Sequence, residues 1–244
     1  MLNELELTGR ARTHLAEVAE LGCLLHRETA ERILELRDAA RASGIELAAV
    51  SGHRGLAQQI AIWNAKLRGE RRLLDRRGRV LDRGALSERQ AVDAVLVWSA
   101  LPGASRHHWG SELDVIDRAA LPAGYRVALE APEFAPGGVF ARLAAWLDEH
   151  ARRFGFFRPY ACDRGGVMPE PWHLSYAPVA VPALRALSLE LLAETIAGAS
   201  MDAREQVLAR LPEIYERYVV AVDPPAEGSL TGACPPGRGA GSEP

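Results

Sequence analysis

The sequence lacks any long apolar run, and it has few cysteines. None of its hydrophobic stretches approaches the ~18–20 residues that a helix needs to cross a bilayer, which excludes a membrane-spanning protein. The three cysteines, Cys23, Cys162 and Cys234, are an odd number at wide spacings. This pattern argues against both a disulfide framework and a cysteine-based zinc site.

The sequence also lacks a strong excess of one charge and a visible export signal. It has 29 basic and 32 acidic residues, a net charge of −3, so its total charge does not imply a nucleic-acid surface. Residues 1–7 are acidic and alternating, with no basic region followed by an apolar one. We therefore expect a cytoplasmic protein, or a periplasmic one if a leader has been removed.

The 244 residues, of which 48% are hydrophobic and 25% charged, are typical of one globular domain with appendages. We predict that this domain spans residues 1–222. Hydrophobic periodicity predicts helices over 13–43, 55–66, 87–99, 139–154, 182–197 and 202–218, and short strands over 45–50, 113–117 and 172–176. His14, His26 and His150 lie among charges in helical patterns, which indicates surface positions. Residues 223–244 are rich in proline and glycine, which predicts a disordered tail.

Residues 66–90 form a basic insertion. They hold nine basic side chains against four acidic ones, and two short apolar segments flank Arg76-Arg77-Gly78, which predicts a small hairpin. Such charge runs usually form a solvated surface. A platform for an anionic polymer is the alternative, but the stretch lacks interleaved aromatic residues.

Unusual residues concentrate in three short segments, 51–54, 105–114 and 169–173. In the middle segment His107 lies on a glycine-containing loop, and Asp114 follows in the predicted strand, between Leu113 and Val115. Alternation turns Asp114 away from the face that its two neighbours bury. An aspartate on that face, close to histidines, indicates a functional site.

His107, Asp114 and His173 form the ligand set typical of catalytic zinc: three protein ligands, with the fourth position left for water. Glu170 is the natural general base for that water. Pro169 and Pro171 exclude a helix around it, so we predict an extended loop or bulge that turns Glu170 back toward the metal. Spacing alone leaves open whether these histidines are ligands or ordinary buried side chains.

These segments resemble the zinc peptidases that include the VanY-type D-alanyl-D-alanine carboxypeptidases and the VanX-type dipeptidases. The signature Ser-x-His-x-x-Gly-x-x-x-Asp is met by residues 105, 107, 110 and 114, and the later Glu-x-Trp-His by residues 170, 172 and 173. An upstream Ser-Gly-Tyr-Arg pattern, with Gln five residues after the Arg, is met at residues 51, 52, 54 and 59, with His53 in place of Tyr. Gly55 and Ser175 replace a frequent Ser and Arg, and His108 beside His107 makes an exchange of ligands conceivable.

The resemblance implies a role for each matching residue. Zinc would be bound by His107, Asp114 and His173, and Glu170 would be the catalytic base. Arg54 would stabilise the oxyanion or hold the substrate carboxylate, since a guanidinium is permanently charged. Ser105 would bind the terminal carboxylate, Gln59 is a weaker candidate for the same pocket, and Trp172 is either a wall of the site or a core aromatic.

The resemblance implies an α+β fold of the Hedgehog/D,D-peptidase type, with a small antiparallel sheet that carries a zinc site and helices packed around it. The implied activity is a zinc-dependent carboxypeptidase that removes a terminal D-amino acid from peptidoglycan stem peptides, with L,D or D,D specificity. Peptidoglycan-derived muropeptides are the expected partners. A peptidoglycan endopeptidase, a D,D-dipeptidase and a non-catalytic zinc-binding module are the alternatives.

Overall fold

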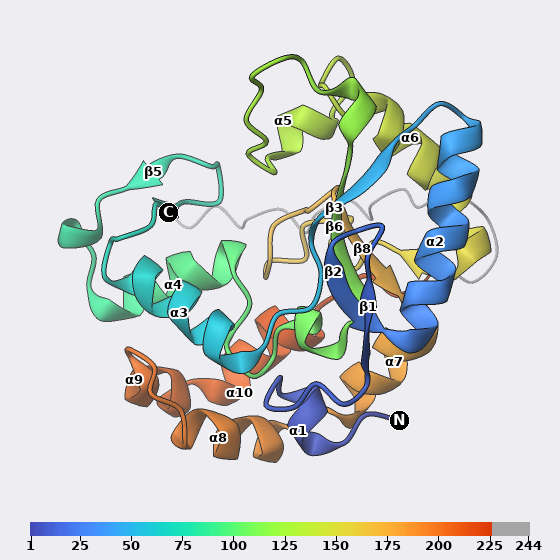
Figure 1. Ribbon diagram of the computed structural model, residues 1–244. Helices are drawn as coiled ribbons and strands as arrows, with labels where there is room; N and C mark the ends of the chain where they lie inside the picture. The colour runs from blue at the N-terminus through green and yellow to red at the C-terminus, as the bar shows by residue number, and fades with distance from the viewer. Residues whose placement is uncertain (226–244) are drawn as a thin grey trace.

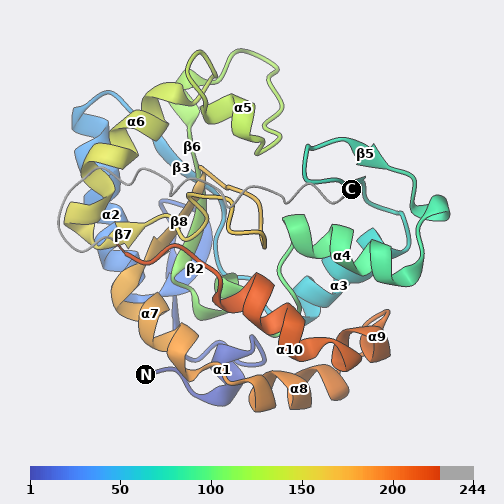
Figure 2. The ribbon, with the colours of Figure 1, turned by 180° about the vertical axis from the view of Figure 1, so that it is seen from behind.

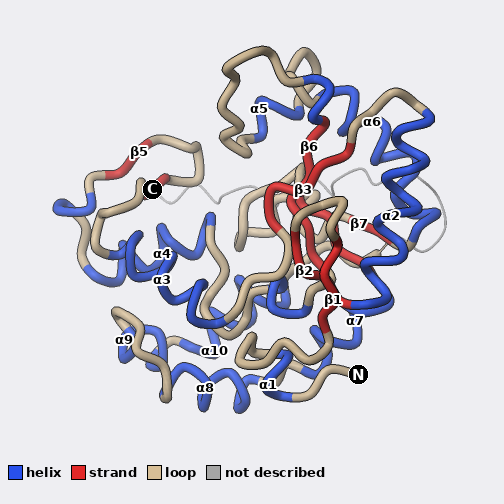
Figure 3. The backbone as a smooth tube through the Cα atoms, in the orientation of Figure 1, coloured by secondary structure: helices blue, strands red, loops and turns tan. Residues whose placement is uncertain are grey.

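A four-stranded antiparallel sheet lies at the centre of the computed structural model, which describes residues 1–225 (Figures 1 and 3). Its strands are ordered β3 (Leu47–Ser51), β6 (Glu112–Asp117), β8 (His173–Tyr176) and β7 (Phe156–Phe157). The expected α+β class with a small antiparallel sheet is confirmed. Within the described residues, no helix is both long and apolar enough to cross a bilayer.

Strand register positions the site. In the β6–β8 pair, Asp114 lies directly opposite His173, although the two residues are far apart in the sequence. In the β3–β6 pair a shift in register between Ala49 and Ser51 places Ser51 opposite Asp114. All three of the segments singled out in the sequence therefore meet at one end of β6.

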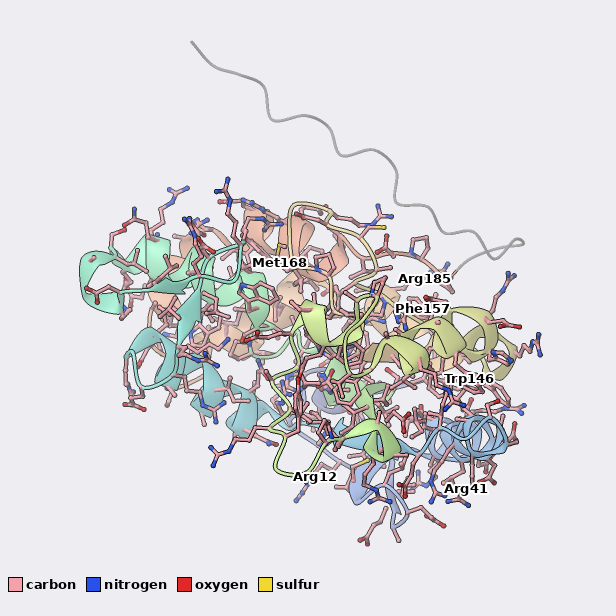
Figure 4. The ribbon with its side chains drawn as sticks, turned by 90° about the horizontal axis from the view of Figure 1, so that it is seen from above. Arg12, Arg41, Trp146, Phe157, Met168 and Arg185 are labelled. Carbon is pink, nitrogen blue, oxygen red and sulfur yellow. The ribbon has the colours of Figure 1, made fainter. Side chains whose placement is uncertain are left out.

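Helices cover the sheet on two flanks (Figures 1 and 2). On one flank lie α2 (Arg27–Ala42) and α6 (Ala141–His150), which continues as a 3₁₀ turn, η4 (Ala151–Phe154). Trp146 of α6 donates a hydrogen bond to Ser43 at the end of α2, and Figure 4 shows these helices side by side. The fully buried side chains of this flank include Leu25, Ile33, Leu36, Leu113, Val115, Phe140, Leu143 and Leu174.

The other flank is a larger helical layer. It contains α3 (Leu56–Leu67), α4 (Glu88–Trp98), α7 (Ala177–Ala186), α8 (Leu189–Ala197), α9 (Arg204–Ala209), α10 (Leu211–Ile214) and a π-helical turn, η5 (Tyr215–Val220). The structure also has two short helices, α1 (Glu4–Leu7) and α5 (Ala131–Phe134). It has three further 3₁₀ turns, η1 (Arg83–Ala85), η2 (Arg106–Trp109) and η3 (Arg118–Ala120). The core of this helical layer contains Trp63, Val92, Leu96, Trp109, Leu192, Ile196 and Ile214.

The helix expected over 13–43 is wrong in its first half. This part forms a hairpin of β1 (Leu15–Val18) and β2 (Cys23–His26), and the helix begins only at residue 27. Gly22 has a φ of +65°, a left-handed conformation that interrupts a right-handed helix and makes the turn. His14, expected at the surface, is buried, and its Nε2 lies 3.2 Å from the carbonyl oxygen of His108.

The C-terminal helices also differ from expectation. The predicted helix 182–197 is two helices, because Ser188 caps a new one by accepting a hydrogen bond from the Leu191 amide. Pro182 lies inside α7 instead of at its start. Asp223, placed in the predicted disordered tail, is buried and accepts a hydrogen bond from the Cys162 amide. The rest of that prediction, from residue 226 onward, lies outside the described residues.

The hairpin predicted in the basic insertion is confirmed. It consists of β4 (Leu73–Leu74) and β5 (Val80–Leu81), which pair in antiparallel register. The prediction from the cysteines is wrong in one respect: Cys162 is disulfide-bonded, whereas Cys23 carries a free thiol.

Candidate metal and catalytic site

Three side chains from different elements converge into a candidate metal centre. His107 comes from η2, Asp114 from β6 and His173 from β8, and one ligand atom of each lies within 4.8 Å of the others. Asp114 is central: its carboxylate oxygens lie 3.6 Å from His107 Nε2 and 3.2 Å from His173 Nδ1. All three side chains are buried.

A glycine makes this convergence possible. Gly110 ends η2 with a φ of +68°, and the chain turns there directly into β6. A Cβ at this position would lie 2.5 Å from both the backbone nitrogen of His26 and a methyl group of Leu15. The position therefore requires glycine both for its conformation and for the close approach of β2.

In each histidine, one ring nitrogen contacts an oxygen outside the ligand group, and the other ring nitrogen faces Asp114. His107 Nδ1 lies 2.8 Å from the Gly52 carbonyl oxygen, to which it can only donate. His173 Nε2 lies 2.7 Å from Glu112 Oε2. Metal-binding histidines are oriented by such bonds to carbonyl or carboxylate oxygens. Two imidazoles and one carboxylate, oriented in this way, fit a divalent transition metal.

Burial lowers the pKa of His107 to about 4, so this imidazole is neutral and available as a ligand at pH 7. The pKa of His173 is raised, because hydrogen bonds to Asp114, Glu112 and Glu170 outweigh its burial. Without a metal, His173 is therefore held as a cation among three carboxylates. A metal ion that binds there takes the place of a proton.

Glu112 anchors a buried network behind His173. Besides His173, its carboxylate accepts hydrogen bonds of 2.8 Å from Ser175 and Ser111, and Arg106 lies 3.4 Å away. Burial acts to raise the pKa of Glu112, but the Arg106 charge and the hydrogen bonds lower it to about 2. Sequence reasoning missed this residue. The available signal was its spacing, since Glu112 lies two positions before Asp114 and shares its face of β6.

Glu170 faces the metal centre from the loop predicted around it. The His173 amide donates to the Glu170 carbonyl at 3.1 Å, which makes a tight turn between the two residues. This turn brings Glu170 Oε2 to 3.3 Å from His173 Nδ1. Burial, to which the Asp114 charge adds, raises the pKa of Glu170 against the opposing hydrogen bond and charge of His173.

Arg54 is held in place by two neighbours. Its guanidinium donates to Gln59 Oε1 at 2.9 Å and to Ser51 Oγ at 3.1 Å. Gln59 also donates to the Ala100 carbonyl at 2.7 Å and is fully buried. Both ends of the Gln59 amide are thus engaged, and in the structure it orients Arg54.

The other predicted positions are not members of the candidate ligand group. Ser105 is fully buried, and its hydroxyl has no hydrogen-bond partner in the described part of the chain. Trp172 is buried against Phe134, with ring centroids 5.7 Å apart. His108 lies outside the ligand group, because its nitrogens contact the Arg54 carbonyl at 2.6 Å and the Gly103 amide at 3.2 Å.

Comparison with known proteins decides the family. The family model described as "VanY: D-alanyl-D-alanine carboxypeptidase" matches residues 22–179, which is more than half of the sequence. The chain belongs to this VanY family. The match includes each segment of the metal centre and Glu170, so the resemblance drawn from the motifs is confirmed.

Several known proteins and solved structures are similar to this chain. An uncharacterized protein of Haemophilus influenzae is 35% identical over 122 residues, which cover 49% of this chain and 93% of that protein. A D-alanyl-D-alanine carboxypeptidase of Enterococcus faecalis is 30% identical over 145 residues, 58% of this chain but only 44% of that protein. The structure of VanYB in complex with D-Alanine-D-Alanine matches at a TM-score of 0.50 and 24% identity, with 76% of this chain and 89% of that one covered. This likeness supports the peptidase fold.

Proposed function

We propose that this protein is a zinc-dependent carboxypeptidase that removes a terminal D-amino acid from peptidoglycan stem peptides. The observation that carries the proposal is the cluster of His107, Asp114 and His173 with Glu170 beside it. Membership of the VanY family and the similarity to an Enterococcus faecalis D-alanyl-D-alanine carboxypeptidase support the substrate class.

Zinc suits the donor set because it accepts nitrogen and carboxylate ligands and leaves one position open in catalytic sites. When bound, it supplies a Lewis acid that polarises a carbonyl and acidifies water. The three ligands would be His107 Nε2, His173 Nδ1 and a carboxylate oxygen of Asp114. Gly52 and Glu112 would keep the imidazoles in this orientation.

Glu170 is the proton carrier of the proposed reaction. Its carboxylate takes a proton from the attacking water and then delivers it to the nitrogen of the leaving amino acid. Burial raises the pKa of Glu170, which brings its proton affinity closer to that needed to carry a proton near neutral pH.

Arg54 supplies positive charge for the transition state. Since Gln59 and Ser51 both fix its guanidinium, little reorganisation is needed when the scissile carbonyl oxygen becomes negative. A buried guanidinium keeps its charge at any physiological pH.

Specificity and cellular location are part of the proposal. In the cytoplasm the substrates would be soluble muropeptides, with a bond between a diaminopimelate-type residue and D-Ala. In the periplasm the D-Ala-D-Ala bond of the pentapeptide would be cleaved instead. An endopeptidase or a D,D-dipeptidase would use the same residues with a differently bounded substrate site.

Mass spectrometry of the products tests these options. The protein is incubated with a stem tetrapeptide, a pentapeptide, a cross-linked dimer and D-Ala-D-Ala, each with and without a chelator. Release of D-Ala from the tetrapeptide or pentapeptide, abolished by the chelator, supports the proposal. Product from the dimer or the dipeptide alone overturns it.

Glu170→Ala separates an enzyme from a non-catalytic zinc module. We expect the variant to retain zinc, because Glu170 is not one of the three ligands, and to lose nearly all turnover. Equal turnover in the variant and the wild type would refute the mechanism, and zinc content by elemental analysis is the control.

A further inference from the structure

Lys66 is the single lysine of the chain; the other 28 basic side chains are arginines. It lies in the last turn of α3 and is half-buried. The sequence places it at the start of the basic insertion, to which the proposed reaction assigns no role.

Helix geometry directs Lys66 toward the candidate site. Gln59, which holds Arg54, lies seven residues earlier on α3. Positions seven apart are two helical turns apart on the same face. Lys66 therefore extends the face of α3 that already contacts the site.

Electrostatic coupling supports this placement. Burial lowers the pKa of Lys66 to about 8; Glu170 opposes this shift, while Arg71 and Arg54 add to it. Burial also lowers the pKa of Arg54; Asp114 and Glu170 oppose this shift, while Arg71 adds to it. The loop that carries Glu170 is tied to α4, the neighbour of α3, by a 3.1 Å hydrogen bond from the Met168 amide to the Val97 carbonyl (Figures 2 and 4). Lys66 and Arg54 thus both interact electrostatically with the proposed proton carrier, and Arg71 interacts with these two cations.

Four of the other eight basic side chains in residues 66–90 are already engaged. Arg68 pairs with Asp202, Arg76 with Asp163 and Arg79 with Asp75, and Arg83 donates to the carbonyls of residues 67 and 86. Within residues 1–225, neither Lys66 nor Arg71 has a hydrogen bond or ion pair from its side chain, and Lys66 differs from the exposed unpaired arginines of this stretch because it is half-buried. A partly desolvated ammonium without an anionic partner is costly, and a bound anion would offset that cost.

We propose that Lys66, assisted by Arg71, supplies positive charge for the C-terminal carboxylate of the peptide substrate, a group that the resemblance assigns to the neutral Ser105 hydroxyl. This inference rests on the proposed carboxypeptidase function. Glu170 delivers its proton to the amine of the leaving residue, and the terminal carboxylate is attached to the same α-carbon as that amine. The carboxylate must therefore lie close to the negative charge of Glu170, and nearby cations offset this repulsion. Lys66 is then a specificity-determining residue for a free C-terminus.

A structural role for Lys66 would give a different result. A cation in the last turn of a helix also interacts favourably with the helix dipole. If this were its only role, replacement would lower thermal stability slightly and would leave the preference among substrates unchanged.

Kinetics with paired substrates test the proposal. The wild type, Lys66→Met and Lys66→Arg are compared on a pentapeptide with a free C-terminal carboxylate and on its C-terminal amide. We expect Lys66→Met to lower kcat/KM for the acid about 10- to 100-fold, mainly through KM, with little effect on the amide. Lys66→Arg should restore most of the loss. As a control, Arg72, an exposed cation of the same stretch, is replaced by Met, and kcat/KM should stay unchanged for both substrates.

The outcomes separate this inference from the proposed function. If the wild type cleaves no peptide acid, the proposed function fails. If it does, but the acid-to-amide ratio is the same in wild type and Lys66→Met, the assignment of Lys66 is overturned. An equal loss on both substrates also overturns it, because Lys66 would then bind another carboxylate of the peptide.

The single lysine permits a second test that does not depend on turnover or on a variant. Reductive methylation with ¹³C-formaldehyde labels one side-chain amine in the zinc-loaded protein, distinct from the terminal amine. We expect the lysine signal to shift with D-alanine and not with D-alaninamide. The same response to both compounds, or to neither, would refute the contact.

Discussion

Replacing Glu112 by Gln removes a buried charge while nearly preserving the volume of the side chain. The carboxylate is fully buried and accepts hydrogen bonds from His173, Ser175 and Ser111, with Arg106 close by. An amide cannot accept all of these bonds, and its NH₂ group would face donors. The variant also leaves the buried Arg106 guanidinium without its anionic partner.

The structure sets the size of the effect. A pKa of about 2 for Glu112, in place of the ordinary 4.5, corresponds to about 3 kcal/mol in favour of the ionised form. Removing one partner of a buried ion pair lowers stability by a similar ~3–5 kcal/mol. We therefore expect the free energy of unfolding of the metal-free protein to fall by about 3 kcal/mol at pH 7. Zinc affinity should fall about 10- to 100-fold, because His173 loses the acceptor that orients it.

The lowered pKa of Glu112 determines how its contribution to stability changes with pH. Since the pKa of Glu112 is lower in the folded state, its stabilisation is complete above the unfolded pKa of about 4.5 and is lost as the pH falls toward about 2. Urea unfolding at pH 7 and at pH 3 should thus show a smaller difference between variant and wild type at the lower pH.

A matched control is Glu46→Gln, since Glu46 pairs with Arg118 at the exposed end of β3. We expect no measurable change there. Equal unfolding free energies for Glu112→Gln and the wild type at pH 7, together with equal zinc affinity in a chelator competition, would refute the argument for Glu112.

Three further predictions follow from the site. His173→Ala should lower the zinc content of the purified protein by elemental analysis, and unchanged zinc would reject this ligand. Gly110→Ala should reduce the melting temperature by several degrees or prevent folding, because its Cβ would collide with the His26 backbone nitrogen at a positive φ; a wild-type melting curve would contradict this. Gln59→Ala should free Arg54 and lower kcat at least tenfold while zinc binding stays normal, and an unchanged kcat would show that Arg54 needs no such support.

Residue types and spacing suggested the side chains of the candidate centre, and the family resemblance separated them from ordinary buried side chains. His107, Asp114, His173 and Glu170 belong to short segments whose residue types are chemically distinctive, and the two prolines around Glu170 already exclude a helix. The strands that carry Asp114 and His173 could also be predicted, because apolar and polar residues alternate around both positions.

The local sequence pattern could not predict features that depend on contacts between residues far apart in the chain. Residues 15–26 have helical spacing, yet the turn at Gly22 and the pairing of β1 with β2 make them a hairpin. His14 has the local surroundings of a surface residue but is buried against η2.

The sequence by itself predicted the candidate ligands, the family and the α+β class, because these depend on residue identity and spacing. Only the tertiary structure decided that Glu112 contacts His173, that Gln59 is used to hold Arg54, and that Lys66 is half-buried without a side-chain partner in the described residues. The physical reason is that hydrogen bonds, burial and charge coupling act through space. Register and helix packing bring together groups whose separation along the chain carries no information about their contact.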